Sequence, residues 1–498
     1  MQDRPPALPR WVREITGVAV AVALALVVVG SIAASDRSQL LFRDGDSLLT
    51  ILFARSLEVG QTQDWAMSTV LFIPELLVFC ALRAFGAGVE GSLVINAVVN
   101  LVALYGALRF AAGTRSRAPV AGALLALAAF AALAVCDTSA SRDALELASL
   151  QTTTTYYSAT VVGCVLAVAC GRRSLERESG WRPVAGLAAV SAVSVLSNPL
   201  FAAWATVPLA AVVIAISRRR RAWIVVGTLF GGAALGALAR LPFADVIANT
   251  GTEYADPSQW LASLGYYARL IGERAVTPTG AAALVLTVAL LVVAVVLTIR
   301  SRGDEGALVV TAYSWAAPAL VVIGAIALGT HAARYLQPVA FAASLALVVV
   351  PGLIRVHVPR VVVAIGVLAI VVTGVASIPR ITHAASAPDA DLSCVTTWTD
   401  ASHRTGAGQF WTIRLPKAHV ADPRTLVQVD HRLGAYAWIV NRDDFSVGSV
   451  TFLVLDDQSL AFELPAGVSA SDARVISCGR YTILDFGDRA LPLGPQRS

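Results

Sequence analysis

Residues 15–34 read ITGVAVAVALALVVVGSIAA, a run that contains no charged side chain. A membrane-spanning α-helix needs roughly 20 consecutive apolar residues, so this run is long enough to cross a bilayer once. The acidic stretch Arg43-Asp44-Gly45-Asp46 follows shortly after it. If the run is a first spanning helix, Asp44 and Asp46 lie close to the point where the chain leaves the membrane.

The composition extends this interpretation to most of the chain. Of 498 residues, 56% are hydrophobic and only 14% are charged, against roughly 25% charged in an average soluble protein. Further apolar runs occur at about 91–112, 118–136, 155–171, 182–197, 199–216, 222–240, 279–300, 307–329, 333–351 and 359–378. We therefore expect an α-helical polytopic membrane protein with about eleven spans.

Arginines set the expected orientation of these spans. They cluster in alternate short loops, which the positive-inside rule places in the cytoplasm together with the basic N-terminus. The net charge of +5 is explained in this way, and it does not indicate a nucleic-acid partner. The intervening loops, 35–90, 137–154 and 241–278, are richer in acids and are predicted to lie outside the cell.

A further apolar segment, about 68–85, conflicts with this orientation. If it spanned the membrane, the N-terminus and the loop carrying Arg109, Arg115 and Arg117 could not both be cytoplasmic. Pro74 and Glu75 lie in its middle, where a charge costs roughly 3 kcal/mol on insertion scales. We expect a re-entrant or juxtamembrane segment on the outer side. The alternative is an ordinary span that breaks the positive-inside rule once.

The composition changes after Arg380, so we expect a transmembrane domain over 1–379 and an extracytoplasmic domain over 380–498. The second part has polar turns and possible helices near Pro416 to Asp422. Its β-like segments are Gln409 to Arg414, Thr425 to Asp430, Ala435 to Asn441, Val450 to Leu455 and Arg474 to Phe486. This pattern predicts a soluble α+β domain.

The six cysteines divide by their expected compartment. Four lie in or beside apolar runs and are interpreted as small packing residues; these are Cys80, Cys136, Cys164 and Cys170. Cys394 and Cys478 fall in the outer domain, where oxidising conditions favour a disulfide bond between them. Two unrelated buried thiols are the open alternative.

Several common chemistries have no sequence support. The chain contains no GxxxxGK[ST] phosphate loop, no HExxH and no CxxC, and its histidines are scattered. The predicted spans carry almost no internal charge, whereas acids collect in the outer loops. This distribution favours chemistry at the outer membrane surface, where a lipid-linked substrate is available and cytoplasmic nucleotides are not.

Four short motifs resemble the GT-C superfamily of integral membrane glycosyltransferases, which includes protein O-mannosyltransferases and aminoarabinose transferases. They are the acidic first outer loop with Asp44 and Asp46, Phe72-Ile73-Pro74-Glu75-Leu76, Arg142-Asp143, and Arg334-Tyr335-Leu336-Gln337-Pro338. The resemblance implies transfer of a sugar from a polyprenyl-phosphate donor to a cell-envelope glycan, lipid or protein. The chain lacks the Asp-Glu pair and the His-Pro-Pro or Lys-Pro-Pro of the mannosyltransferase-like pattern.

This chemistry needs a carboxylate base for the acceptor hydroxyl and a cation for the departing phosphate. Asp44 is the first candidate for the base and Asp46 the second, and Asp143 assists Asp44 or shares a metal with it. Carboxylates suit Mg²⁺ or Mn²⁺, although no ligand spacing specifies one. Alternatively, Asp46 caps the helix that begins near Ser47, and Asp44 is a solvated loop charge.

Arg334 is the phosphate candidate, because guanidinium binds phosphate bidentately and this residue opens an outer helix end. Its alternative role is to anchor that helix at the interface. The remaining substrate-binding candidates are Tyr335, Arg142, Tyr156, Tyr157, Glu75 and Arg269. The tyrosines also suit an aromatic interface belt, and Arg269 lies in a stretch, about Pro257 to Ile271, that is typical of an interfacial helix.

Two other classes of function compete with a transferase. A transporter or flippase of a lipid-linked precursor needs a hydrophilic path through the spans. A noncatalytic scaffold would bind envelope partners through its outer domain, with Trp398, Trp411 and Trp438 as a contact surface. The alternative for these tryptophans is a buried core.

Overall fold

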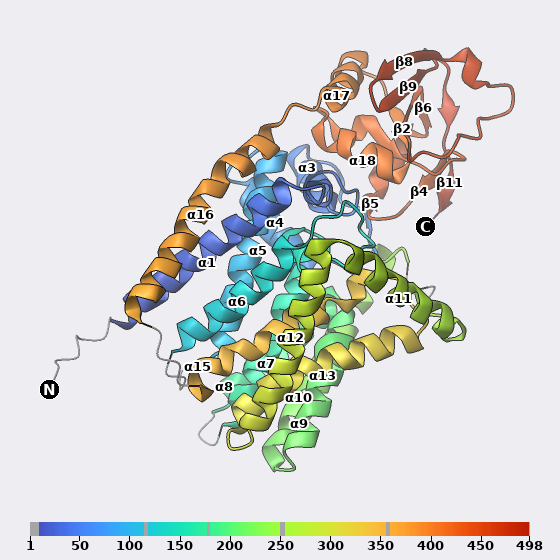
Figure 1. Ribbon diagram of the computed structural model, residues 1–498. Coiled ribbons are helices and arrows are strands. Elements are labelled where there is room, and N and C mark those ends of the chain that lie inside the picture. Colours follow the sequence, from blue (N-terminus) through green and yellow to red (C-terminus); the bar gives the residue numbers. More distant parts are fainter. Residues whose placement is uncertain (1–8, 114–117, 177–179, 250–253, 355–358, 498) are drawn as a thin grey trace. The chain divides into compact units, whose positions relative to one another are not determined.

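The computed structural model describes residues 9–113, 118–176, 180–249, 254–354 and 359–497 (Figure 1). Arg115, Arg117 and residues 250–253 of the third predicted outer loop lie outside these ranges. The chain forms two compact units. The helical unit comprises Met1–Ser38, Ala97–Arg240 and Thr252–Thr382, and the mixed unit comprises Gln39–Asn96, Leu241–Gly251 and His383–Ser498.

The helices are α1 (Arg10–Ala33), α2 (Ser38–Phe42), α3 (Leu49–Glu58), α4 (Ile73–Arg83), α5 (Val89–Ala111), α6 (Pro119–Val135), α7 (Ser158–Leu175), α8 (Arg182–Ser197), α9 (Val207–Ile216), α10 (Arg220–Leu238), α11 (Trp260–Val276), α12 (Pro278–Arg300), α13 (Glu305–Ala327), α14 (Pro338–Leu345), α15 (Val350–Leu353), α16 (Arg360–Ser386), α17 (Ala390–Ser402) and α18 (Phe410–His419). Short 3₁₀ turns include η1 (Ser149–Thr152) and η6 (Ala333–Leu336).

Apolar helices account for every one of the eleven runs predicted to cross a membrane. Among the described residues, eight are long and apolar enough to span: α1, α5, α7, α10, α12, α13, Ala333–Leu353 and Val361–Ser386. Three shorter apolar helices coincide with the other runs: Pro119–Val135, Arg182–Ser197 and Ala202–Ile216. The membrane character is therefore supported, and the number of crossings stays a prediction.

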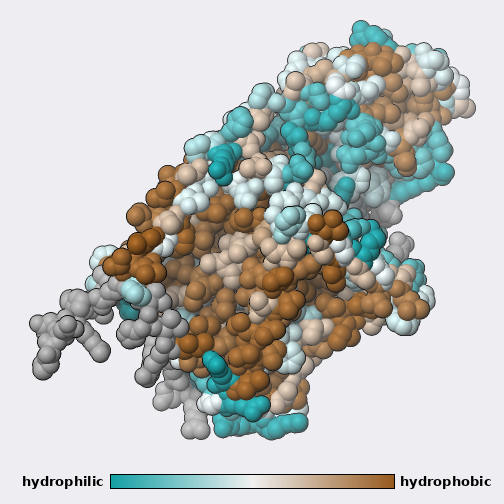
Figure 2. All heavy atoms as spheres, viewed as in Figure 1, coloured by the Kyte–Doolittle hydropathy of each residue, from teal (hydrophilic) through white to brown (hydrophobic). Residues whose placement is uncertain are grey.

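The surface and the charge distribution of the helical unit suit a bilayer. Hydrophobic residues cover the face of α12 and α13 drawn in Figure 2, and only 22% of the apolar window of α12 is buried inside the protein. In the described parts of the candidate spans, the arginine, histidine and acidic residues lie within the first or last two turns. The apolar middle of each helix thereby avoids the cost of a charge in hydrocarbon.

Residues 68–85 do not form a membrane-spanning helix. Their helix, α4, has 11 residues and is about 16 Å long at roughly 1.5 Å per residue, which is too short for a hydrocarbon core of about 30 Å. Pro74 occupies the first turn of α4, where its missing N–H costs no helical hydrogen bond. The proline therefore starts a short helix and does not interrupt a long one. This helix packs beside α3 within the mixed unit.

The mixed unit is built on a five-stranded sheet of order β3-β2-β7-β9-β8. Its strands are β2 (Gly406–Gly408), β3 (Leu426–Gln428), β7 (Phe452–Leu455), β8 (Arg474–Cys478) and β9 (Tyr481–Asp485). Strand β2 is parallel to β3 and β7, whereas β9 is antiparallel to β7 and β8. A Cβ atom at Gly406 would overlap the ring of Phe452, so the strand needs glycine there.

Alternation along β7 divides the core of this unit into two layers. Phe452 and Val454 pack with Val395 of α17 and Ile413 of α18, whereas Leu453 faces a second cluster with Val427. This is the two-residue period of a strand that is covered on both faces. The remaining strands form pairs at the edges of the unit: β1 (Trp65–Ala66) with β5 (Val440–Asn441), β6 (Ser449–Val450) with β10 (Leu491–Pro492), and β4 (Gly434–Tyr436) with β11 (Gly494–Arg497).

One predicted strand is wrong. Gln409 to Arg414 carry β-favouring residues, yet Phe410–His419 is helix α18. Phe410 and Ile413, three residues apart, both point inward, and Ile413 is completely buried in the core. Packing of this helical face therefore overrides local strand propensity. The other four predicted β segments contain strands β3, β4 and β5, β6 and β7, and β8 and β9.

The mixed unit also contains segments that precede the predicted domain boundary at residue 380. Strand β1 from the first predicted outer loop pairs with β5, with Trp65 opposite Asn441, and Met67 forms a bridge with Ile247. Arg55 of α3 donates to the carbonyl of Val420 at 2.5 Å. The first predicted outer loop is thus a structural part of the same unit as the C-terminal region.

Candidate functional site

The acidic stretch forms a tight turn between α2 and α3. Asp44 accepts the backbone N–H of Ser47 on its Oδ2 atom at 3.1 Å, and the carbonyl of Asp46 accepts the N–H of Leu49 at 3.1 Å. Both acids are half-buried. The side chain that caps the turn is therefore Asp44, not Asp46 as the alternative interpretation supposed. This cap holds the Asp44 carboxylate in one orientation.

A completely buried arginine lies directly behind this turn. Arg414 of α18 donates from Nε to the carbonyl of Gly45 at 2.7 Å, and from Nη1 to Gln428 Oε1 at 3.1 Å and to the carbonyl of Ile439 at 2.7 Å. Its guanidinium carbon is 4.8 Å from the centroid of the Phe410 ring. These contacts connect the acidic turn to the sheet and to the start of α18.

The charge on Arg414 is retained at neutral pH. Burial lowers the pKa of this guanidinium to about 10, and the carboxylates of Asp46, Asp44 and Asp444 oppose the shift. A fixed cation therefore stands behind the two acids. Sequence reasoning missed Arg414, because a single arginine in a predicted strand carries no signal of such a role.

An aromatic hollow of about 240 Å³ opens beside the acidic turn. Its lining includes Phe410, Trp411, Tyr436 and Trp438. A Cβ atom at Gly45 would lie 2.9 Å from Trp411 Cε3 and 3.0 Å from Phe410 Cε1, so the turn packs against these two rings. Phe410 and Trp411 therefore contact the acidic turn and also line the hollow.

The three tryptophans of the C-terminal region differ in their surroundings. Trp411 and Trp438 are half-buried in the lining of the hollow. Trp398 packs on Phe452 in the core, with ring centroids 4.8 Å apart and planes at 84°. Trp398 is itself half-buried, so the alternative of a buried core holds for it only in part, whereas the other two tryptophans line the hollow.

In the helical unit, the predicted loop acid Asp143 lies near Tyr266 of α11. Burial raises the pKa of the Tyr266 hydroxyl, and the charge of Asp143 raises it further. The Tyr266 ring also lies 5.4 Å from the His331 ring and 5.6 Å from the guanidinium carbon of Arg269. Asp143 and Arg269, two of the predicted residues, thus meet around one tyrosine, and Arg142 is half-buried next to Asp143.

Helix α11 also contacts the segment that leads to Arg334. Ser263 donates to the carbonyl of Thr330 at 2.6 Å, and the Tyr267 hydroxyl lies 2.8 Å from Thr330 Oγ1. The guanidinium carbon of Arg334 is 5.8 Å from the ring centroid of Tyr335. This helix therefore connects the surroundings of Asp143 with the predicted phosphate residue.

The predicted tyrosines pack next to the Arg334 segment. Trp204 Nε1 donates to the carbonyl of Tyr335 at 3.0 Å, and Gln337 Nε2 donates to the carbonyl of Tyr156 at 3.0 Å. The Tyr157 ring lies edge-on to Trp204 at 5.8 Å. Tyr156 and Tyr157 are only 2% and 7% exposed, so they pack the loop against η6 and α14 and are little exposed to a ligand.

A buried charge network in the same unit was not predicted. Arg37 contacts Glu146 Oε2 at 3.7 Å and donates to Ser149 Oγ at 2.9 Å, while Arg274 pairs with Asp137 at 2.7 Å. Arg274 also lies 3.9 Å from Glu146. The loops were recognised as acid-rich, but their pairing with Arg37 and Arg274 joins sequence segments that no local pattern connects. The network orders the 137–154 loop.

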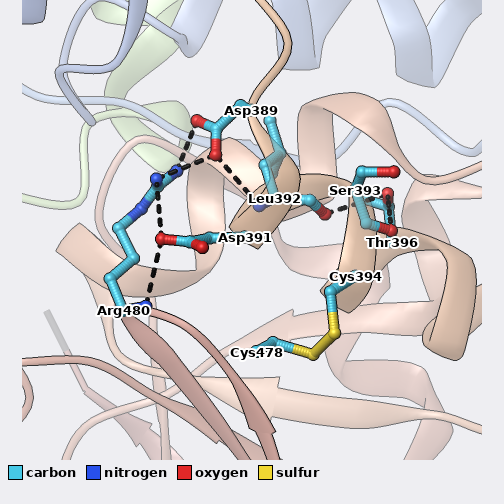
Figure 3. The surroundings of a disulfide bond; sticks show 8 residues. All are labelled: Asp389, Asp391, Leu392, Ser393, Cys394, Thr396, Cys478 and Arg480. Atoms are coloured by element: carbon cyan, nitrogen blue, oxygen red, sulfur yellow. Dashed lines mark hydrogen bonds and ion pairs between the residues drawn. A yellow bond between two sulfur atoms is a disulfide. The ribbon is translucent and has the colours of Figure 1, made fainter.

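The predicted disulfide bond is present in the structure. Cys394 of α17 is bonded to Cys478 at the end of β8, with Cα atoms 5.5 Å apart (Figure 3). Beside it, Asp389 accepts the N–H of Leu392 at 3.1 Å, capping α17, and pairs with Arg480 at 2.6 Å. The disulfide bond and the ion pair thus join the start of α17 to the hairpin formed by β8 and β9.

The predicted site residues thus fall into two groups. The mixed unit holds Asp44 and Asp46 at the acidic turn, and Glu75 buried in the first turn of α4. The helical unit holds the others: Arg142, Asp143, Tyr156, Tyr157, Arg269, Arg334 and Tyr335.

The acidic turn does not fit the suggested Mg²⁺ or Mn²⁺. Among the described residues, no group of three or more histidine, cysteine or acidic side chains is placed to hold a metal ion. The guanidinium of Arg414 already supplies a positive charge next to Asp44 and Asp46. We therefore assign no step to a metal.

Comparison of the chain with protein-family models and with curated proteins found no match. The resemblance to the GT-C superfamily stays a prediction that the motifs of this chain support.

Proposed function

We propose that the protein is a membrane glycosyltransferase that moves a sugar from a polyprenyl-phosphate donor to a cell-envelope acceptor. The supporting observation is the oriented Asp44 carboxylate, which lies in a turn that packs against an aromatic hollow. The proposal includes eleven spans, a cytoplasmic N-terminus and a mixed unit on the outer face of the cell membrane. A lipid-linked donor is the activated sugar that this face can receive.

In the proposed reaction, Asp44 accepts the proton of an acceptor hydroxyl as its oxygen forms a bond with the anomeric carbon of the sugar. The bond from that carbon to the phosphate oxygen breaks, and the phosphate leaves with the electron pair. The departing negative charge needs a cation or hydrogen-bond donors at the site. The Ser47 N–H orients Asp44, and Arg414 holds the backbone of the turn.

The helical unit supports a transferase better than the alternative of a transporter. In the described parts of the candidate spans, the arginines and acids lie near the helix ends and not in the middles. A hydrophilic substrate path usually contains buried charged groups at mid-membrane depth.

The test is transfer of labelled sugar by the full-length protein in lipid nanodiscs, with polyprenyl-phosphate mannose, glucose and arabinose as donors and cell-envelope extract as acceptor. Asp44→Asn should lower the rate by at least roughly 100-fold, because it removes the base. Asparagine caps a turn as well as aspartate does, so the melting temperature should stay unchanged.

Asp457→Asn is the matched control, because Asp457 is an exposed acid of the same unit. Its transfer rate should equal that of the wild type. Full activity in Asp44→Asn would overturn the assignment of the base. Absence of transfer from all three donors by the wild-type protein would count against the proposed function itself.

A further inference from the structure

The aromatic hollow beside the acidic turn has a lining suited to a sugar ring. A pyranose presents C–H groups on its flat faces and hydroxyls around its rim, so it stacks on aromatic rings and forms hydrogen bonds at its edge. Trp411 and Trp438 supply large half-buried ring surfaces. Asp430 and Gln458 supply a carboxylate and an amide in the same lining. Ligand sites commonly combine apolar walls with a few placed polar groups in this way.

The lining is ordered before any ligand binds. Phe410 packs edge-on against Trp411, with centroids 4.5 Å apart, and edge-on against Tyr436 at 6.2 Å. Asp430 Oδ1 accepts the N–H groups of Arg432 and Gly434, each at 2.8 Å. The rings and the carboxylate are therefore held in place, which lowers the entropy lost on binding.

The size of the hollow limits its occupant. Its volume of about 240 Å³ lies below the roughly 300–1,000 Å³ of sites for drug-sized ligands. One sugar unit is of suitable size, and a longer glycan would extend past exposed Gln458 into solvent.

The position of the hollow relates it to the reaction. Phe410 and Trp411 line the hollow, and they are the rings against which Gly45 packs between Asp44 and Asp46. A sugar held on these rings would stand close to the acidic turn.

We infer that this hollow binds one pyranose unit of a glycan acceptor and that the acceptor class of the enzyme is therefore a glycan. The acceptor assignment depends on the proposed function, whereas sugar binding by the hollow does not. Binding and transfer can thus be tested separately.

Sugar binding is tested by saturation-transfer difference NMR on the full-length protein in nanodiscs free of sugar-headed detergents, which would compete for the site. The probes are methyl α-D-mannopyranoside, methyl β-D-glucopyranoside and methyl β-D-galactopyranoside. At least one should receive saturation, strongest at the C–H protons of its stacked face. Trp411→Ala and Trp438→Ala should each weaken binding roughly tenfold.

Two further variants separate binding from folding. Gln458→Ala changes an exposed side chain and should weaken binding severalfold without altering the melting temperature. Trp181→Ala removes a tryptophan that is 74% exposed in the helical unit and should bind like the wild type. Absence of saturation for all three glycosides in the wild type would overturn the inference. Binding as strong as that of the wild type in both Trp411→Ala and Trp438→Ala would overturn it as well.

The transfer assay tests whether the hollow binds a sugar of the acceptor or the sugar of the donor. Trp411→Ala should raise the KM for the acceptor and leave the KM for the polyprenyl-phosphate sugar unchanged. An increase confined to the donor KM would show that the hollow holds the donor sugar, and this would overturn the acceptor assignment. Glycoside binding without transfer from any donor would instead reject the proposed function and leave sugar binding in place.

Discussion

At the scale of single residues, the buried guanidinium of Arg414 determines the surroundings of the acidic turn. It is fully enclosed, yet three of its hydrogen bonds reach three separate segments, at Gly45, Gln428 and Ile439. A buried charge is tolerated only when hydrogen bonds and opposite charges replace its hydration. Asp44 and Asp46 supply part of the opposite charge here.

Replacing Arg414 should therefore destabilise the mixed unit. Arg414→Met keeps much of the side-chain volume but leaves the carbonyls of Gly45 and Ile439 without this donor. We expect a loss of about 3 kcal/mol in the free energy of unfolding. Thermal unfolding of the full-length protein, followed by tryptophan fluorescence, measures it.

The matched control is Arg424→Met. Arg424 is exposed and pairs with Asp422 at 2.7 Å, and an exposed pair contributes only about 0–1 kcal/mol. An unchanged melting temperature in Arg414→Met would show that the guanidinium does not support the turn.

At the scale of elements, the start of α5 is tied to the end of α18 by one pair. His419 Nε2 lies 2.8 Å from Glu90 Oε1, and His419 Nδ1 lies 3.0 Å from the carbonyl of Leu415. Burial lowers the pKa of His419, but these hydrogen bonds and the Glu90 charge outweigh it, so the pKa is raised above its ordinary value of 6.5. Arg55 acts in the opposite direction.

This raised pKa predicts a pH dependence of stability. Because the folded protein holds the His419 proton more tightly than the unfolded chain does, the pair stabilises fully below pH 6.5 and loses its effect as the pH rises through the raised pKa. The stability difference between wild type and His419→Gln should decline over that range. Thermal melts of both proteins across a pH series test this, and a difference that stays constant or grows would contradict it.

Some helices could be predicted from the local sequence pattern alone, and other elements could not. The apolar helices were predictable because bilayer-length runs of apolar residues have few other solutions. Pro74 lies in the middle of the apolar segment 68–85, yet it stands in the first turn of α4, where proline is tolerated. The strand predicted for Gln409 to Arg414 is wrong. Their side chains favour strands, but the surfaces against which they pack as a helix come from elsewhere in the chain.

At the scale of the whole molecule, the chain forms two units from interleaved segments, so residues 39–96 belong with residues 383–498. The disulfide bond between Cys394 and Cys478 closes a separation of 84 residues in the mixed unit. Such bonds persist in oxidising compartments, which agrees with the proposed outer location of this unit. Both the bond and the orientation can be tested in cells.

We predict that a membrane-impermeant maleimide labels Cys394 and Cys478 in intact cells only after an impermeant reductant has been added. The protein used should carry alanine at the other four cysteines: Cys80, Cys136, Cys164 and Cys170. Gly303→Cys, at an exposed position in the predicted cytoplasmic loop after α12, is the control and should react only after permeabilisation. Labelling without reductant would contradict the bond, and labelling of Gly303→Cys in intact cells would contradict the orientation.

The apolar helices, the distinct composition of the C-terminal region and the acids at positions 44 and 46 could be recognised without a structure. These features are local, because hydrophobicity and charge act over a few turns of chain. The surroundings of Asp44 depend on the folded chain: the guanidinium of Arg414 bonds to Gly45 across 369 positions, and the aromatic hollow joins α18 to the loops around Asp430 and Trp438. Contacts between such distant segments depend on how the whole chain packs, and no short pattern encodes them.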